Sequence, residues 1–213
     1  MSTTLIFAEL LIIGLEVAIW LFILGIDIFG YQWLQGGQIP ILNNWQTIFV
    51  TLFFSLIYVL GVIFDRIADT AFSRWNHQIR NKIIPQVKNQ IIPSNIPAHV
   101  AVIRFEVGKE NEALNHQFEY TRSRIRITRA SSLNFVVITF LIAIFIVVYL
   151  QSNPVWWKYL CFSLGIGITL TVASIFTWYR LTVAYLRFLK SSYDFETSKQ
   201  VANKPPLVET SKQ

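Results

Sequence analysis

The sequence predicts an all-α integral membrane protein with four transmembrane helices and a mostly helical cytoplasmic insert between the second and the third. Hydrophobic residues make up 54% of the 213 residues and charged residues only 14%, whereas about a quarter of a soluble domain is charged. The apolar residues fall into four long blocks, and most of the Lys and Arg residues lie in the segments at one side of those blocks.

Each apolar block reaches or approaches the roughly 20 residues that a helix needs to cross a bilayer core. The blocks are 5–29, 45–64, 133–150 and 155 to about 179. The first is too long for a signal peptide and lacks a basic n-region and a small-residue cleavage site. We therefore divide the chain into a transmembrane hairpin (1–66), a basic cytoplasmic insert (67–130), a second hairpin (131–190) and a disordered cytoplasmic tail (191–213).

The distribution of Lys and Arg predicts the orientation of these helices. The links 30–44 and 151–154 contain no Lys or Arg, whereas 65–130 and the segment after the fourth block are rich in both. The positive-inside rule then places both termini and the insert in the cytoplasm. We expect a multi-pass protein of the cell membrane, inner or plasma, with the lipid bilayer as its surroundings.

The first block carries three carboxylates on one helix face. Glu9, Glu16 and Asp27 are separated by intervals that return to nearly the same angle at about 100° per residue. We place Glu9 near the cytoplasmic end, Glu16 near mid-bilayer and Asp27 near the outer interface. An ionised carboxylate at the bilayer centre costs at least about 2.5 kcal/mol, so this face should meet protein or water. For Glu9 and Asp27 the favoured role is structural, with water, Arg180 or Arg187 as the partner.

Polar faces on the other blocks indicate which helices enclose these carboxylates. The second block and its continuation carry a polar face with Thr47, Thr51, Ser55, Tyr58, Asp65 and Asp69. The fourth carries small and hydroxyl residues, which in membrane helices are most often a packing surface. The third is apolar nearly throughout, so we expect it to face lipid while the other three enclose a partly polar seam. The candidate intramembrane polar pathway is Glu9, Glu16, Asp27, Thr51, Ser55 and Tyr58.

Glu16 is the most unusual of these residues, because no Lys, Arg or His lies at its predicted depth in any block. It could be protonated, hydrogen-bonded to a hydroxyl such as Ser55 or Thr171, or exposed to water. An ionisable group inside a membrane is a functional candidate by default. Packing and function both remain open for Glu16.

The insert begins as a continuation of the second helix over 65–84, with helical spacing of its apolar residues. Three prolines then break the chain into a loop, Pro85, Pro93 and Pro97. The pattern of 99–107 does not decide between helix and strand. From about residue 109, apolar spacings of three and four predict one long helix that runs into the third block, with a strand over 122–128 as the rival.

Two charged groups stand out in the insert. Arg122, Arg124, Arg126 and Arg129 precede the third block, and basic residues near an anionic membrane surface each contribute about 1 kcal/mol of attraction. We expect them to contact anionic lipid; the alternative is a ring of arginines that binds a phosphorylated ligand in an oligomer. The group Asp65, Arg66 and Asp69 predicts a cytoplasmic salt-bridge cluster rather than a cation site.

The sequence contains no recognised catalytic motif, neither a Walker A, GxGxxG, HExxH, GxSxG nor CxxC pattern. Cys161 is the single cysteine, and the three histidines are scattered through the insert. We expect no enzyme activity, catalytic residue, cofactor, metal or nucleic-acid partner.

Two functional hypotheses remain. One hypothesis is a homo-oligomer that forms or gates a small-cation pathway lined by Glu16 and controlled by the insert. The alternative is a non-conducting membrane adaptor or assembly factor whose insert docks a cytoplasmic partner. The cost of Glu16 slightly favours the first.

Overall fold

The computed structural model describes residues 3–30, 42–84, 100, 104 and 112–202. The regular elements in this part of the chain are four helices: α1 (Thr3–Phe29), α3 (Leu42–Ile83), α5 (Glu112–Tyr149) and α6 (Trp156–Ala202). Each is long and apolar enough to cross a membrane. The predicted all-helical class and the four candidate transmembrane segments are confirmed.

Three of the helices extend well beyond their apolar blocks. α3 continues to Ile83, and α5 begins at Glu112 and runs without interruption to Tyr149. The predicted continuation of the second helix and the predicted long helix before the third block are therefore confirmed, and 122–128 is helical rather than a strand. The segment 99–107 lies outside the described residues except for Val100 and Arg104. α6 continues to Ala202, so the first part of the expected disordered tail is helical.

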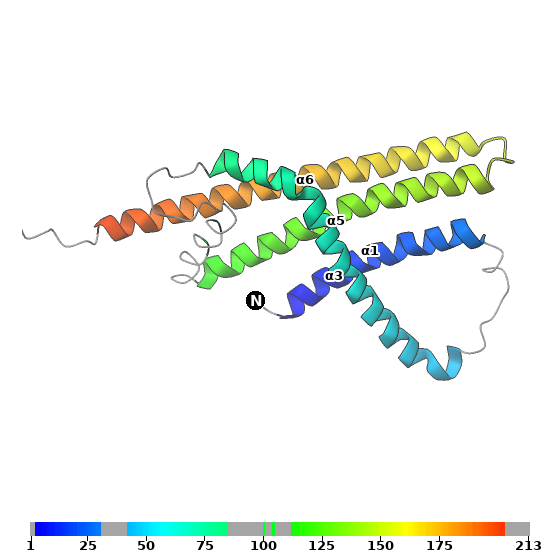
Figure 1. Ribbon diagram of the computed structural model, residues 1–213, viewed down its shortest axis with the longest axis horizontal. Helices are drawn as coiled ribbons and strands as arrows, with labels where there is room; N and C mark the ends of the chain where they lie inside the picture. Colours follow the sequence, from blue (N-terminus) through cyan, green and yellow to red (C-terminus); the bar gives the residue numbers. More distant parts are fainter. Residues whose placement is uncertain (1–2, 31–41, 85–99, 101–103, 105–111, 203–213) are drawn as a thin grey trace, which may run out of the picture.

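The helices are arranged around α5. Figure 1 shows α5 and α6 side by side as a long hairpin, α1 alongside α5, and α3 crossing the other three obliquely. α1 and α5 run in the same direction, because contacts from the start of α1 reach Arg126 and contacts from its end reach Tyr149. α5 therefore separates α1 from α6 over most of its length.

α1 and α3 cross where two glycines meet. A Cβ on Gly14 would collide with the carbonyl oxygen of Ile57, and a Cβ on Gly61 would collide with that of Leu10. The two backbones are therefore in direct contact, which is the arrangement that small residues permit between membrane helices. On the N-terminal side of this crossing, the described side chains of α3 from Thr47 to Leu56 are all exposed.

α5 is the central helix, and the expectation that it faces lipid is wrong. Its buried residues include Ser131, Ser132 and Asn134 at the start of its apolar run, and Ser131 and Asn134 bond to α1. The apolar stretch of α6 is the least buried of the four. A seam enclosed by α1, α3 and α6 is therefore also not observed. Hydroxyl content is not a sign of the interior here, since Gly165, Thr169 and Thr177 of α6 are exposed.

Two hydrophobic clusters hold the helices together. The first joins α1, α3 and α5 through Ile13, Val17, Phe64, Ala68 and Ala130. The second, which we call the distal core, joins the end of α3, the start of α5 and the extension of α6 through Ile84, Val100, Phe118, Leu186 and Leu189. The helical extensions therefore form a packed region of their own rather than three separate projections.

Candidate functional site

The acidic face of α1 lies directly against α5. Glu9 contacts Arg126, Glu16 contacts Ser131 and Asn134, and the backbone of Asp27 contacts Tyr149. The three contacts follow one another in the same order along both helices. The candidate site is therefore a line of polar contacts at the interface between α1 and α5.

Glu9 and Arg126 form an ion pair at a distance of 3.1 Å between Oε1 and Nη1. The side chain of Glu9 is completely buried, and that of Arg126 is mostly buried. Arg126 takes the place of Arg180 and Arg187, the partners considered from the sequence; the guanidinium of Arg180 instead lies over the ring of Phe176. Removing either member of a buried pair leaves an uncompensated charge, so this contact constrains how α1 packs on α5.

Glu16 takes part in a polar network that also contains Trp20, Ser131 and Asn134. The Ser131 hydroxyl donates to Oε1 of Glu16 at 2.7 Å, and the Asn134 amide donates to Oε2 at 2.7 Å. The indole N–H of Trp20 donates to Oδ1 of Asn134 at 3.2 Å. Because Oδ1 of Asn134 accepts the bond from Trp20, the amide nitrogen of Asn134 faces Glu16. Both carboxylate oxygens of Glu16 therefore accept a hydrogen bond, one from Ser131 and one from Asn134. This pattern suits a carboxylate, which is an acceptor only.

The register of α1 and α5 sets the level of Glu16 relative to the apolar run of α5. Its partners Ser131 and Asn134 lie at the beginning of the apolar run 133–150, so Glu16 is level with the edge of that run and not with its middle. Ser55 and Thr171, the hydroxyl partners considered from the sequence, are not the donors to Glu16.

The α3 members of the predicted pathway do not join this network. Thr51 and Ser55 are exposed, and their hydroxyls donate to the backbone carbonyls of Thr47 and Thr51 at 2.9 Å each. The ring of Tyr58 stacks on Phe7 with 5.3 Å between centroids. The structure therefore brings the α1 part of the predicted pathway together with α5, leaves Thr51 and Ser55 at the surface and packs Tyr58 against α1.

Arg129 joins α3 to α5. Its guanidinium binds Asp69 through Nη1 and Asp65 through Nη2, the latter at 3.1 Å. Arg129 and Asp65 are buried, whereas Asp69 is exposed. We call these three residues the Arg129 cluster. Arg66, which the sequence placed in this cluster, is exposed, and the ion pairs of the described residues do not include it.

The other arginines of the basic run have different surroundings. Arg122 lies 3.6 Å from Glu119, which also pairs with Arg104. Arg124 is exposed, with its guanidinium 5.0 Å from the centroid of the Tyr120 ring. Of the four arginines expected to contact anionic lipid, Arg126 and Arg129 are bound to acidic residues of other helices, and Arg124 is exposed.

The far end of α1 differs from its beginning. The Tyr149 hydroxyl donates to the backbone carbonyls of Ile26 and Asp27 at 3.3 and 3.1 Å. The carboxylate oxygens of Asp27 accept no hydrogen bond from the described residues. Gly30 follows with φ of 77° and donates to the carbonyl of Ile26, as a glycine that ends a helix does. At this end, α1 and α5 are joined through the backbone of α1.

Sequence reasoning identified the acids of this site but missed Ser131 and Asn134. One signal was present: Asn134 is the single amide side chain in the block 133–150, and two serines precede that block directly. Among the described residues, no group of three or more His, Cys, Asp or Glu side chains could hold a metal ion. No protein family, curated protein or solved structure matches this chain.

Proposed function

We propose that the chain is a multi-pass protein of the cell membrane, with both termini in the cytoplasm, that acts as a non-conducting adaptor or assembly factor. Its cytoplasmic insert docks a partner protein. The observation that carries this proposal is that Glu9 and Glu16 are both bonded to α5 within the same chain.

This observation removes the main reason for a conducting pathway. A carboxylate in an apolar helix is costly when it has no partner, and that cost favoured a functional role for Glu16. Two donors from α5 satisfy Glu16, and Arg126 neutralises Glu9. Glu9 and Glu16 therefore stabilise the packing of α1 on α5, and no permeating ion is needed to explain these two acids.

The helical extensions supply the docking region. α5 is one continuous helix from Glu112 through the polar network to Tyr149, and the Arg129 cluster ties it to α3 at the base of the insert. The distal core packs the extensions of α3, α5 and α6 against one another. A partner bound to these extensions would thus be held by helices that continue directly into the apolar segments.

A small-cation pathway through a homo-oligomer is the second candidate. It is favoured by the surroundings of Glu16, whose hydrogen-bond donors among the described residues are all neutral. The exposed described side chains of α3 from Thr47 to Leu56 include the hydroxyls of Thr51 and Ser55, which in an oligomer would face a neighbouring copy. In this candidate the insert controls a pathway lined by Glu16.

Cation flux in proteoliposomes separates the two candidates. We expect the parent chain, Glu16→Gln and Glu16→Leu to give the same H⁺, Na⁺ and K⁺ flux as protein-free liposomes. A flux in the parent that Glu16→Gln abolishes, with the folded protein intact, would replace the adaptor proposal with the cation pathway.

The membrane placement has a separate test. A reporter fused after Gln213 or inserted near Pro93 should read cytoplasmic, and one inserted between Gly36 and Gly37 should read external, because Lys and Arg are retained on the cytoplasmic side. The opposite labelling at either position contradicts the proposed topology.

A further inference from the structure

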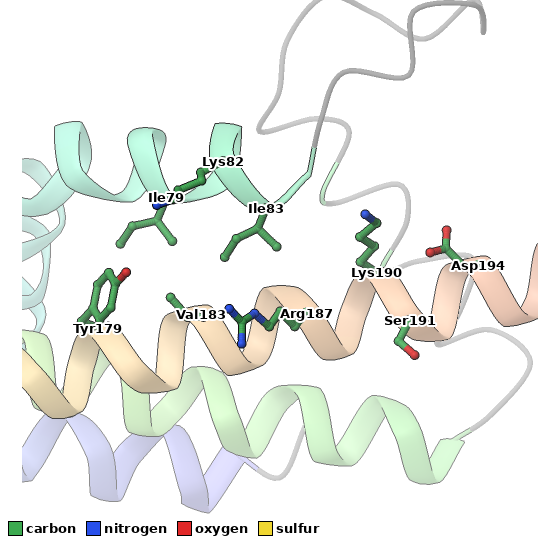
Figure 2. A pocket seen from close by; sticks show the side chains of 9 residues that line it. All are labelled: Ile79, Lys82, Ile83, Tyr179, Val183, Arg187, Lys190, Ser191 and Asp194. Carbon is green, nitrogen blue, oxygen red and sulfur yellow. The ribbon is translucent and has the colours of Figure 1, made fainter.

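A basic pocket lies between the end of α3 and the extension of α6. It has a volume of about 500 Å³ and is lined by Ile79, Lys82, Ile83, Tyr179, Val183, Arg187, Lys190, Ser191 and Asp194. Figure 2 shows Ile79 and Ile83 pointing from α3 toward α6, with Lys190 and Asp194 extending from α6 on the side of α3. Three cations and one acid line the pocket, so its charge favours an anion.

The cations of this pocket are available to a ligand. Lys82, Arg187 and Lys190 are all exposed. The ion pairs formed by the described residues involve Arg104, Arg122, Arg126 and Arg129, and include none of these three. The pocket thus differs from the basic run of α5, where arginines are already bound to acids.

An apolar groove continues from the basic pocket. It has a volume of about 460 Å³ and is lined by Trp75, Gln78, Ile79, Val172, Ile175, Phe176, Trp178 and Tyr179. Ile79 and Tyr179 line both the groove and the pocket, so the two are contiguous. On α6 the groove occupies the end of the apolar segment, and the basic residues follow within the next turns. A ligand that fills both must be apolar at one end and anionic at the other.

We propose that an anionic phospholipid binds between α3 and α6, with its phosphate headgroup at Lys82, Arg187 and Lys190. One acyl chain lies in the apolar groove, against Trp75 and Phe176. Tyr179 lies where the apolar groove meets the basic pocket. This position suits the proposed lipid, because tyrosine and tryptophan side chains are enriched at membrane interfaces. The site rests on the membrane placement proposed above, because that placement puts the groove at the cytoplasmic edge of the bilayer.

The test uses the full chain reconstituted in nanodiscs of equal parts phosphatidylglycerol and phosphatidylcholine, followed by native mass spectrometry of the lipids retained in mild detergent. We expect the parent to retain phosphatidylglycerol in preference to phosphatidylcholine. The triple variant Lys82→Gln, Arg187→Gln and Lys190→Gln should retain at least about tenfold less, because the phosphate headgroup loses all three of its cationic contacts. Val172→Trp should also lower retention, because it fills the groove and leaves the cations unchanged.

A matched control removes the same charge from elsewhere. Arg66→Gln, Arg74→Gln and Arg124→Gln together remove three exposed cations outside the pocket and should leave retention of phosphatidylglycerol as in the parent.

Two outcomes would overturn the proposal. If both triple variants lost phosphatidylglycerol equally, the lipid would be attracted to the basic surface in general and not bound at this pocket. Normal retention in Val172→Trp, together with displacement of the lipid by millimolar inorganic phosphate, would overturn it in favour of a free-anion site. A chain that does not enter nanodiscs contradicts the membrane placement itself, whereas one that enters without preferring phosphatidylglycerol contradicts only this site.

Discussion

Two basic regions of this molecule use their charge differently. The arginines of the run 122–129 in α5 lie closer together in sequence than the cations of the basic pocket. Arg126 and Arg129 are nevertheless bound to Glu9, Asp65 and Asp69 inside the helix bundle. The cations at the ends of α3 and α6 are scattered in sequence, yet they meet at one exposed pocket.

The difference shows that charge density along the chain does not predict accessible charge. A guanidinium can form several charge-assisted bonds at once, so Arg129 can hold two acids of α3 and still lie almost fully buried. We therefore assign Arg126 and Arg129 to the fold and the cations of the pocket to ligand binding. Substitutions at buried and at exposed positions test that assignment.

Arg129→Met should cause the largest loss of stability, about 3–5 kcal/mol in the free energy of unfolding, because it leaves buried Asp65 without a counter-charge. Unfolding of the purified protein in detergent measures this change. Adding Asp65→Asn and Asp69→Asn to Arg129→Met should recover part of the loss. A loss below about 1 kcal/mol would mean that the Arg129 cluster does not hold α3 to α5.

Gly61→Ala should destabilise the protein by about 1–3 kcal/mol, because the added methyl group meets the carbonyl oxygen of Leu10 on α1. The matched control is Gly165→Ala on α6, where a Cβ meets nothing within 4 Å. That control should be neutral or stabilising by up to about 1 kcal/mol, as alanine is the better helix former. Equal effects at both positions would contradict the close crossing of α1 and α3.

Glu16→Leu should cost about 1–3 kcal/mol, because the Ser131 hydroxyl and the Asn134 amide would lose their acceptor. Glu16→Gln should cost less than Glu16→Leu, since its amide oxygen still accepts one of the two bonds. The comparison is made by chemical unfolding of the three proteins. A loss that is larger for Gln than for Leu would contradict the hydrogen-bond arrangement of the polar network.

Arg124→Met should have the smallest effect, within about 0.5 kcal/mol, because Arg124 is exposed and its described contact is with the Tyr120 ring. It is the matched control for Arg129→Met, since both variants remove one arginine from the same helix. If the two variants lost equal stability, the contrast between buried and exposed arginines of α5 would be wrong.

Much of the fold could be predicted from the sequence, because apolar blocks of sufficient length specify helices and the spacing of Leu114, Phe118, Thr121 and Ile125 specifies a continuous α5. Which helices pack against one another could not be predicted from the sequence. Periodicity gives the direction of a face relative to its own helix, but it does not say which helix covers it. The block 133–150 is apolar on nearly all sides, and the donors that bind Glu16 come from its first turn and from the residues just before it.

The central claim is that Glu9 and Glu16 hold α1 against α5, and a double-mutant cycle on Glu9 and Arg126 tests it most directly. Glu9→Gln, Arg126→Gln and the double variant are compared in their free energies of unfolding. We predict a coupling energy of about 0.5–3 kcal/mol, as for residues in direct contact, with the double variant more stable than the sum of the two single losses implies. Effects that add to within about 0.3–0.5 kcal/mol would show that Glu9 and Arg126 do not interact, and would contradict the packing of α1 on α5.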